Sequence, residues 1–276
     1  MIDLHVHTFY SDGTNSPEAV VRLAKKTGVE TIAITDHDGT DGIPEAMAAG
    51  KKYGVSVIPG IEISVTNEGG NMHILGYKMN LENEGFKTAV GTMRRNRAER
   101  NERLLAAFGD MGITITEENI KKYAPMDYAG KPQMALVLVE QGYIENVREA
   151  FTSDKFFRSE AMSRIKKVKV SPKEAIKLIL ASGGLPVLAH PYTLKLSKEK
   201  LNEKIRELSG FGLKGLECYY SDHSPEMTLE CACLAHKYGL ITTIGSDFHG
   251  KEIDPNIEIG LGRNGNLKNY NKELPF

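Results

Sequence analysis

Apolar and polar side chains alternate strictly over residues 2–7, at the start of the chain. A period of two is typical of a β-strand that packs one face against a core. Short apolar runs recur along the chain, and helical patterns that end at glycines separate many of them. Further strands are predicted at 30–38, 55–64, 71–79, 185–190, 213–220 and 240–247, and helices at 16–28, 42–54, 171–184, 203–212 and 225–239.

This alternation predicts an α/β fold with a mainly parallel sheet. Six or seven strand–helix units with apolar strand interiors favour a closed barrel over an open sheet. The rhythm breaks between residues 78 and 170, where helical patterns at 84–112, 116–124, 131–142 and 146–153 follow one another. We therefore expect a barrel of residues 1–77 and 171–276, with 78–170 as a helical insertion that covers the active site.

Composition narrows the class of protein. Of 276 residues 41% are hydrophobic, which allows a large core, and the formal net charge is −1, which favours neither a nucleic-acid coat nor a membrane surface. No apolar run approaches the roughly 20 residues of a membrane helix, and the N-terminus lacks a signal-peptide pattern. Cys218, Cys231 and Cys233 have no metal-type spacing and are expected to be reduced core thiols. These features predict a cytoplasmic protein.

Two histidines in the first strand raise the question of chemistry. His5 and His7 lie two residues apart, so their side chains share one face of the strand. They are either hydrogen-bonded histidines on an edge strand or half of a metal site, since imidazole is the commonest nitrogen ligand.

The positions of the other metal-capable side chains decide between these alternatives. Six of the eight histidines fall in predicted strands or at strand ends, chiefly the C-terminal ends, and Asp12 lies in the loop after the first strand. The C-terminal ends converge on one rim of a parallel barrel, where active sites are built. Scattered structural histidines would show no such bias. The predicted metal ligands are His5, His7, Asp12, His37, Glu62, His73, His190, Asp247 and His249.

The ordered motifs HVH, SDG, TDHD, GIEIS, H, AHP and SDFH resemble the polymerase and histidinol phosphatase (PHP) family of metal-dependent phosphoesterases. The arginine-rich helix, KPQMALVLVEQG and ILASGGLPVLAHP resemble the branch of nucleoside 3',5'-bisphosphate phosphatases and 5'-to-3' exoribonucleases. The resemblance implies a distorted seven-stranded β/α barrel, (β/α)7, with a helical insertion. It also implies two or three divalent metal ions, commonly manganese, iron or zinc.

The resemblance assigns the ligands to three ions. The first would be held by His5, His7, Glu62 and Asp247, the second by Glu62, His73 and His190, and the third by Asp12, His37 and His249. Asp12 stands where many relatives have a histidine, which would weaken the third site. Mixed nitrogen and oxygen ligands suit these borderline metals, and a bridging carboxylate suits in-line phosphoryl displacement by metal-activated hydroxide.

The catalytic and substrate-binding residues are predicted from weaker signals than the metal ligands. Asp247 and His223 are the predicted catalytic residues; His223 would stabilise the leaving group or contact phosphate, or is only a hydrogen-bonded loop histidine. Lys131, Pro132 and Gln133 replace an R-P-H triplet with which relatives grip phosphate, so Lys131 keeps a charge but not the fork of arginine. Lys131, Arg158 and His223 are the predicted substrate-binding residues.

Several functions fit this set of residues. The first is a phosphatase that removes the 3'-phosphate of a 3',5'-bisphosphonucleotide; the alternatives are a 5'-to-3' exoribonuclease on short RNA and a histidinol-phosphatase type of enzyme. A non-enzymatic module is disfavoured, because every expected ligand position holds a competent side chain. The basic helix at 94–103 either favours a polyanionic substrate or is a solvated face with i, i+4 ion pairs. No membrane contact is predicted, and the sequence leaves the oligomeric state open.

Overall fold

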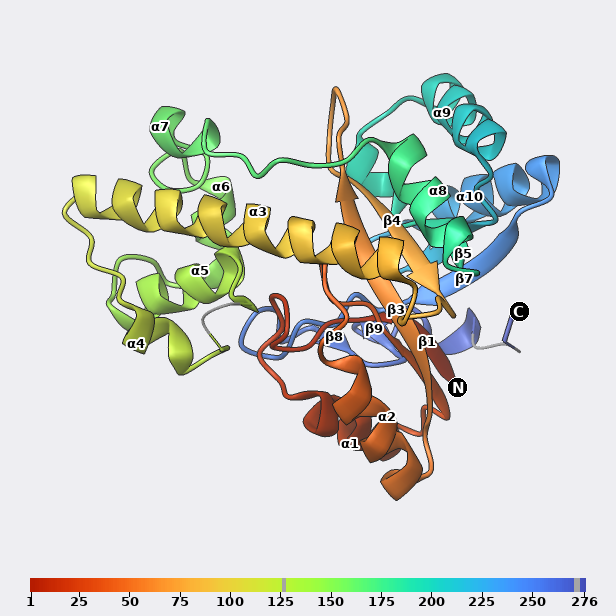
Figure 1. Ribbon diagram of the computed structural model, residues 1–276, viewed down its shortest axis with the longest axis horizontal. Coiled ribbons are helices and arrows are strands. Elements are labelled where there is room, and N and C mark those ends of the chain that lie inside the picture. Colours follow the sequence, from red (N-terminus) through yellow and green to blue (C-terminus); the bar gives the residue numbers. More distant parts are fainter. Residues whose placement is uncertain (126–127, 271–273) are drawn as a thin grey trace.

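Seven strands form one sheet that curls almost into a barrel (Figure 1). The computed structural model describes residues 1–125, 128–270 and 274–276. The strands are β1 (Ile2–Val6), β2 (Thr31–Ile34), β3 (Ser56–Val65), β4 (Met72–Tyr77), β5 (Leu185–Leu188), β6 (Gly215–Tyr220) and β7 (Ile241–Gly245), and they keep this order in the sheet. Val6 forms a parallel bridge with Phe248, just beyond β7, so the two edges of the sheet nearly meet.

The sheet is mixed because β4 runs against both of its neighbours. The pairings β1–β2, β2–β3, β5–β6 and β6–β7 are parallel, whereas β4 is antiparallel to β3 and to β5. Only residues 66–71 connect β3 to β4, and a parallel crossover needs about a dozen residues or more. The predicted α/β fold with seven strands in a nearly closed barrel is confirmed, with one strand reversed.

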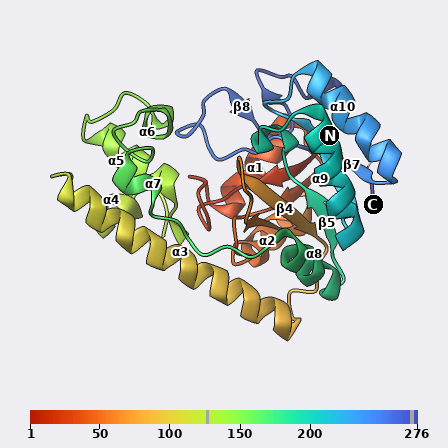
Figure 2. The ribbon, with the colours of Figure 1, turned by 90° about the horizontal axis from the view of Figure 1, so that it is seen from above.

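Five helices cover the outside of the barrel. These are α1 (Pro17–Thr27), α2 (Ile43–Tyr53), α8 (Pro172–Ala181), α9 (Lys198–Phe211) and α10 (Pro225–Tyr238). Helices α1 and α2 share a core with β1 and β2, and α8, α9 and α10 lie over the later strands (Figure 2). Beyond β7 the chain adds a small hairpin of β8 (Ile257–Glu258) and β9 (Gly262–Arg263).

The segment between β4 and β5 is helical. It begins with the 27-residue helix α3 (Glu84–Asp110) and continues through α4 (Glu117–Lys121), α5 (Lys131–Glu140), α6 (Val147–Thr152) and α7 (Glu160–Ser163). These helices have their own apolar core, separate from the core clusters of the barrel. In Figure 1, α3 extends from the barrel side of the molecule to the group formed by α4 to α7.

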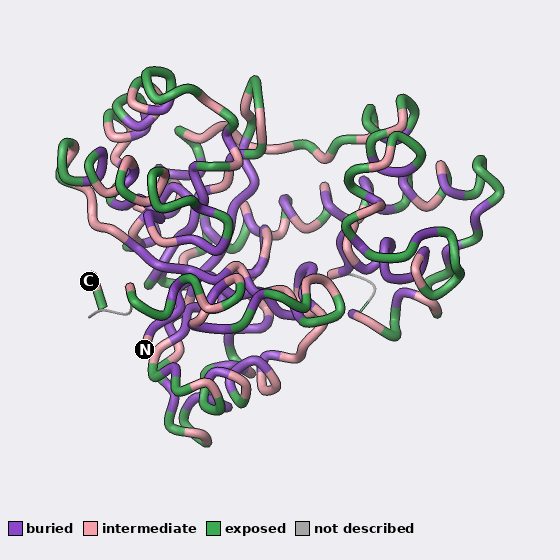
Figure 3. The backbone as a smooth tube through the Cα atoms, turned by 180° about the vertical axis from the view of Figure 1, so that it is seen from behind, coloured by how far each residue is buried: buried purple, intermediate pink, exposed green. Residues whose placement is uncertain are grey.

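Burial follows this arrangement, with most buried residues in the strands and in the inner faces of the helices (Figure 3). Cys218 and Cys231 are buried as expected, but Cys233 is exposed, so its prediction as a core thiol was wrong. Residues two apart on a helix point to different faces, and Cys231 occupies the inner face of α10. None of the helices in the described ranges has both the length and the apolar character to cross a membrane.

Candidate metal centre and its cavity

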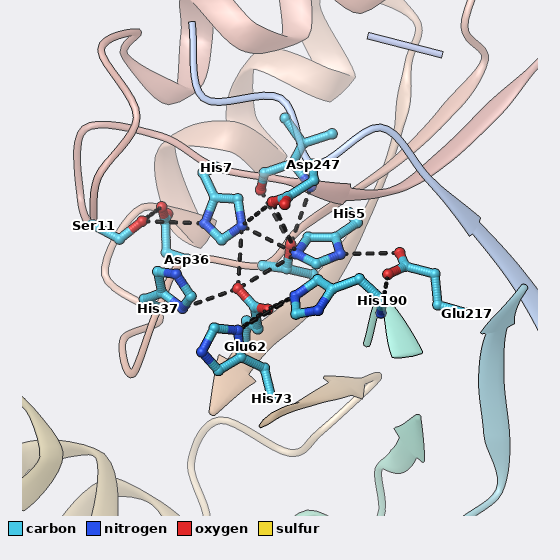
Figure 4. A network of polar contacts seen from close by, with 12 residues as sticks. His5, His7, Ser11, Asp36, His37, Glu62, His73, His190, Glu217 and Asp247 are labelled. Atoms are coloured by element: carbon cyan, nitrogen blue, oxygen red, sulfur yellow. Dashed lines mark hydrogen bonds and ion pairs between the residues drawn. The ribbon is translucent and has the colours of Figure 1, made fainter. Parts of the chain in front are cut away.

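His5 and His7 place two imidazoles on one side of β1 and the turn that follows it (Figure 4). Both residues are buried, and their Nε2 atoms lie 3.1 Å apart. Two glycines make this close arrangement possible. A Cβ on Gly13 would lie 2.8 Å from the carbonyl oxygen of His7, and a Cβ on Gly245 would lie 2.2 Å from the Cβ of His5. Glycine therefore lets the loop after β1 and the end of β7 approach the histidines.

Glu62, on the buried part of β3, lies at the centre of the site. Its Oε1 is 2.8 Å from both His73 Nδ1 and His190 Nε2. Its Oε2 is 2.9 Å from His37 Nδ1 and within 3.4 Å of Nε2 of each β1 histidine. One carboxylate thus faces five imidazoles that come from four different segments of the barrel rim.

The segment after β7 adds the remaining side chains. Asp247 Oδ1 lies 3.1 Å from His7 Nε2, and its Oδ2 accepts a 2.9 Å hydrogen bond from the Tyr220 hydroxyl. His249 Nε2 lies 3.2 Å from Asp12 Oδ1, and the other oxygen of Asp12 is 3.5 Å from His37 Nε2. All nine predicted ligands therefore come together at one end of the barrel.

Four overlapping groups of these side chains have ligand atoms close enough to share an ion. They are His7, Asp12, His37 and His249; His5, His7 and Asp247; His5, Glu62 and His190; and His37, Glu62 and His73. The groups contain the nine predicted ligands and no other residue. His7 also joins the group assigned to the third ion, which the sequence did not suggest. The division among three ions stays a prediction.

The contacts inside the cluster fit a bound cation better than a hydrogen-bond network. His37 Nδ1 and Glu62 Oε2 are only 2.9 Å apart, yet neither atom makes a hydrogen bond to any described residue. Buried polar atoms without hydrogen-bond partners are costly, and a metal ion would satisfy both an imidazole nitrogen and a carboxylate oxygen that face each other in this way. The mixed set of imidazoles and carboxylates suits manganese, iron or zinc.

Electrostatics prepare the carboxylates as ligands. Burial opposes ionisation of Glu62, but the rings of His37 and His73 outweigh it and hold the carboxyl pKa well below its usual range. The pKa values of Asp12 and Asp247 are lowered in the same way against burial.

The histidines divide into two kinds. Burial lowers the pKa of His73 to about 4, so that ring is neutral and ready to coordinate. Burial also opposes protonation of His7, but hydrogen bonds that its ring donates to Asp247 and Glu62 raise its pKa to about 10. The three carboxylates therefore attract positive charge to the site, which either protons or metal ions can supply.

The backbone is strained at two of the predicted ligands. His190 has φ of 25° and Asp247 has φ of 58°, both in the left-handed region that favours glycine. Such strain costs about 1–3 kcal/mol per residue and persists where a site requires it. Here it directs the two side chains from the ends of β5 and β7 into the cluster.

Glu217 is a site residue that the sequence analysis missed. It is fully buried in β6, its Oε1 lies 3.0 Å from His5 Nδ1, and its Oε2 accepts a 2.7 Å bond from the His190 backbone N–H. A glutamate inside the apolar run LKGLECYY was the available signal, because buried glutamates are almost always paired. Asp36 has a similar supporting role, since it accepts hydrogen bonds from the Ser11 and Thr8 hydroxyls.

A cavity of about 750 Å³ opens beside the cluster. The predicted metal ligands Asp12, His37 and His73 line this cavity, and the predicted substrate contacts Lys131 and Arg158 also line it. Lys131 is half-buried, and its Nζ lies 5.0 Å from the ring centre of Phe157. Arg158 is exposed, with its Nε 3.4 Å from Asp154. The cavity thus brings cations of the helical segment to the metal-binding end of the barrel.

His223 and Gln133 are placed differently. His223 is buried; its Nδ1 donates to the Cys218 carbonyl at 3.0 Å, and its Nε2 accepts from the Tyr192 backbone N–H at 3.4 Å. It does not line the cavity; its ring lies 5.2 Å from that of Tyr220, which donates to Asp247. Gln133 links α5 to the loop after β1, because its Nε2 donates to the Gly13 carbonyl at 2.8 Å.

Comparisons with known proteins agree with this geometry. The PHP domain family matches residues 3–157. The 3',5'-nucleoside bisphosphate phosphatase of Chromobacterium violaceum has 27% sequence identity to this chain; the alignment covers 90% of this chain and 87% of the relative. The phosphoribosyl 1,2-cyclic phosphate 1,2-diphosphodiesterase of Eggerthella lenta has 30% identity, with 90% of this chain and 94% of the relative aligned. The 5'-3' exoribonuclease Rnm of Salmonella typhimurium has 30% identity, with 94% of this chain and 87% of the relative aligned.

A solved structure shows the same fold. The structure of an amidohydrolase from Chromobacterium violaceum, with bound sulfate and no metal, superimposes with a TM-score of 0.83 at 27% identity. The match covers 91% of this chain and 89% of the other. Barrel and helical segment are therefore shared over nearly the full length of both chains.

Proposed function

The chain belongs to the PHP domain family and is a metal-dependent phosphoric ester hydrolase, and we propose that it removes the 3'-phosphate from a 3',5'-bisphosphonucleotide. A relative at 27% identity is named as a 3',5'-nucleoside bisphosphate phosphatase, but relatives at 30% are named as a cyclic phosphate diphosphodiesterase and an exoribonuclease. The choice among substrates therefore depends on the site rather than on identity.

The observation that carries the proposal is the composition of the cavity. Its volume of about 750 Å³ is in the usual range for small-molecule sites. The predicted metal ligands Asp12, His37 and His73 line the cavity, and so do Lys131 and the aromatic side chains of Phe151 and Phe157. A bisphosphonucleotide offers matching groups: one phosphate for the metal ligands, a second for Lys131, and a flat base for the aromatic rings.

The side chains divide the task. The nine predicted ligands would hold two or three divalent ions, with Glu62 facing more than one of them. When bound, such ions supply Lewis acidity to the phosphate and lower the pKa of water. Glu217 and Tyr220 position His5 and Asp247, and Lys131 holds the phosphate that is not cleaved.

In this proposal His223 either protonates the leaving oxygen or positions Tyr220. Protonating the leaving oxygen would require its Nε2 to release the Tyr192 backbone N–H. Burial lowers the pKa of His223, so the ring is neutral near pH 7 and is better suited to positioning Tyr220 than to donating a proton. Asp247 remains the catalytic residue of the two, because its Oδ1 lies within the cluster.

A second candidate is a 5'-to-3' exoribonuclease acting on short RNA. The exoribonuclease Rnm, 30% identical over 94% of this chain, favours it. Both reactions place a terminal nucleotide phosphate at the same cluster. Three unpaired cysteines and a nucleotide substrate suit the cytoplasm as the compartment for either activity.

A turnover screen tests the proposal. Metal-loaded enzyme would be assayed with 3',5'-bisphosphonucleotides, the matching monophosphates, sugar phosphates and short RNAs. We expect the highest kcat/KM with a 3',5'-bisphosphonucleotide. A higher value with short 5'-phosphorylated RNA would select the exoribonuclease, and equal values for sugar phosphates would overturn the nucleotide proposal.

A further inference from the structure

Helix α3 buries two arginines and one asparagine in the middle of an otherwise apolar stripe. The N-terminal part of the stripe packs into the barrel core, and the C-terminal part packs into the core of the helical segment. The stripe consists of Phe86, Val90, Met93, Arg97, Arg100, Asn101, Leu104 and Phe108. Arg97 and Arg100 are only 5% and 9% exposed, and both line the cavity beside the metal cluster. The basic helix is therefore not simply a solvated face.

Arg97 has buried donors without partners. Its Nε and Nη1 atoms make no hydrogen bond to any described residue. Its Nη2 lies 3.9 Å from Asp12 Oδ2, at the limit of an ion pair, and Asp12 is shared with His37 and His249. A buried guanidinium with two unfilled donors is costly, so these donors point to an anion that the cavity receives.

Arg100 belongs to a second group of cations. Lys131, at the start of α5, and Lys169, on the segment that returns to the barrel, line the same cavity. None of these three side chains forms an ion pair with a carboxylate among the described residues, whereas neighbouring Lys167 is paired with Asp38. The cations thus come from three separate segments; Asp38 acts on Arg100 and Lys169 through space, but none of the three has a paired carboxylate among the described residues.

The titration behaviour agrees with this crowding. Burial, followed by the charges of Arg100 and Lys169, lowers the pKa of Lys131 to about 8. Burial, followed by Arg97, lowers the pKa of Arg100 to about 10. Crowded cations that depress one another are stabilised when an anion binds between them.

We propose that Arg97 and Arg100 define two successive phosphate positions in the cavity. Arg97, beside Asp12, holds an oxygen of the phosphate that is cleaved. Arg100, with Lys131 and Lys169, holds the second phosphate. The two arginines are three residues apart, about 4.5 Å along the helix axis, and their long side chains reach two phosphates of one nucleotide. This inference rests on the proposed function and identifies the substrate class as compact molecules with two separated phosphates.

The two reaction products report on the two positions separately. In the proposed reaction, inorganic phosphate leaves the Arg97 position, and the nucleoside 5'-monophosphate leaves the Arg100 position. The test measures the inhibition constants of inorganic phosphate and adenosine 5'-monophosphate with metal-loaded enzyme. Arg97→Gln and Arg100→Gln remove charge while keeping a polar side chain. Arg95→Gln is the matched control, because Arg95 is exposed on the same helix and its Nη2 donates to Thr92 Oγ1.

We expect Arg100→Gln to raise the inhibition constant of adenosine 5'-monophosphate about tenfold to a hundredfold and that of phosphate less than about threefold. Arg97→Gln should do the reverse, and Arg95→Gln should change neither. Thermal melting of each variant shows whether it is folded; Arg100→Lys, which keeps the charge, replaces Arg100→Gln if that variant melts early, and should keep most of the affinity. Equal effects of the two substitutions on both inhibitors, or no effect on either, would overturn the inference.

The outcome is separable from that of the proposed function. Any phosphate ester that the enzyme hydrolyses can serve as the reporter, so the inhibition constants do not depend on the natural substrate. A clear preference for bisphosphonucleotides that survives Arg100→Gln would reject the second phosphate position and keep the proposed function. No preference, combined with no inhibition by adenosine 5'-monophosphate, would reject both.

Discussion

Glu217 Oε1 lies 3.0 Å from Nδ1 of His5, and both side chains are completely buried. The other oxygen of Glu217 accepts the backbone N–H of His190 at 2.7 Å. One carboxylate therefore fixes the ring of one predicted ligand and the backbone of another. Such outer partners set the orientation and basicity of a ligating imidazole.

Replacing Glu217 with glutamine should weaken metal binding without unfolding the protein. Glutamine has a single acceptor oxygen, so it can satisfy His5 or His190 but not both. Loss of such a partner typically costs ten- to a hundredfold in metal affinity. Metal retained after dialysis, measured by elemental analysis, checks this. Glu230→Gln, on α10 and 3.8 Å from Lys198, is the control and should retain its metal.

We expect the purified protein to carry at least two divalent ions per chain, because nine side chains offer ligands within overlapping groups. Elemental analysis of protein prepared without chelator measures this directly. Chelation should abolish turnover and lower the melting temperature, since an ion that binds only the folded state stabilises it. Fewer than one ion per chain after reconstitution would contradict the metal centre.

Glu62→Gln should reduce turnover at least about a hundredfold with little loss of fold. The substitution keeps the size of the side chain but removes the charge that faces His37, His73 and His190. Steady-state kinetics with metal in excess, together with circular dichroism, separate the two effects. Near wild-type turnover with metal bound would show that Glu62 does not bridge ions.

Lys131→Ala should erase most of the preference for a 3',5'-bisphosphonucleotide over the matching monophosphate. A charge-assisted contact contributes about 1.5–3 kcal/mol, so its loss should lower kcat/KM about ten- to a hundredfold for the doubly phosphorylated substrate only. Lys155→Ala, an exposed lysine of the same helical segment, is the control. If a preference exists but ignores Lys131, Arg158 and Arg100, which also line the cavity, are the next cations to replace; Arg94 is paired with Asp41 and does not line it.

The strands and the predicted metal ligands could be identified from the sequence, because both follow from local sequence patterns. Period-two alternation placed β1, and the positions of the histidines at strand ends showed that they would meet on one rim. The reversed direction of β4 was not predicted, although the short connection at 66–71 contains that information. A pairing direction depends on connection length, which periodicity does not measure.

The burial of Arg97 and Arg100 and the contact of Glu217 with His5 could not be predicted from the sequence, for a different reason. Arg97 and Arg100 lie in a run that also suits a solvated helix, because charge alone does not reveal burial. Their burial results from tertiary packing, since α3 is held at one end by the barrel and at the other by the helical segment. The role of Glu217 also depends on tertiary structure, because its partner His5 is 212 residues away in the sequence.

The pKa of Lys131, lowered to about 8 mainly by burial and then by Arg100 and Lys169, gives the substrate preference a pH dependence. As pH rises through about 8, Lys131 in the free enzyme loses its proton and its attraction for the second phosphate. The ratio of kcat/KM for a bisphosphonucleotide to that for the monophosphate should therefore fall between pH 7 and pH 9. Lys131→Arg keeps its charge over this range, so its ratio should stay level. A wild-type ratio that is the same at both pH values, or a Lys131→Arg ratio that falls equally, would show that the titrating group is not Lys131.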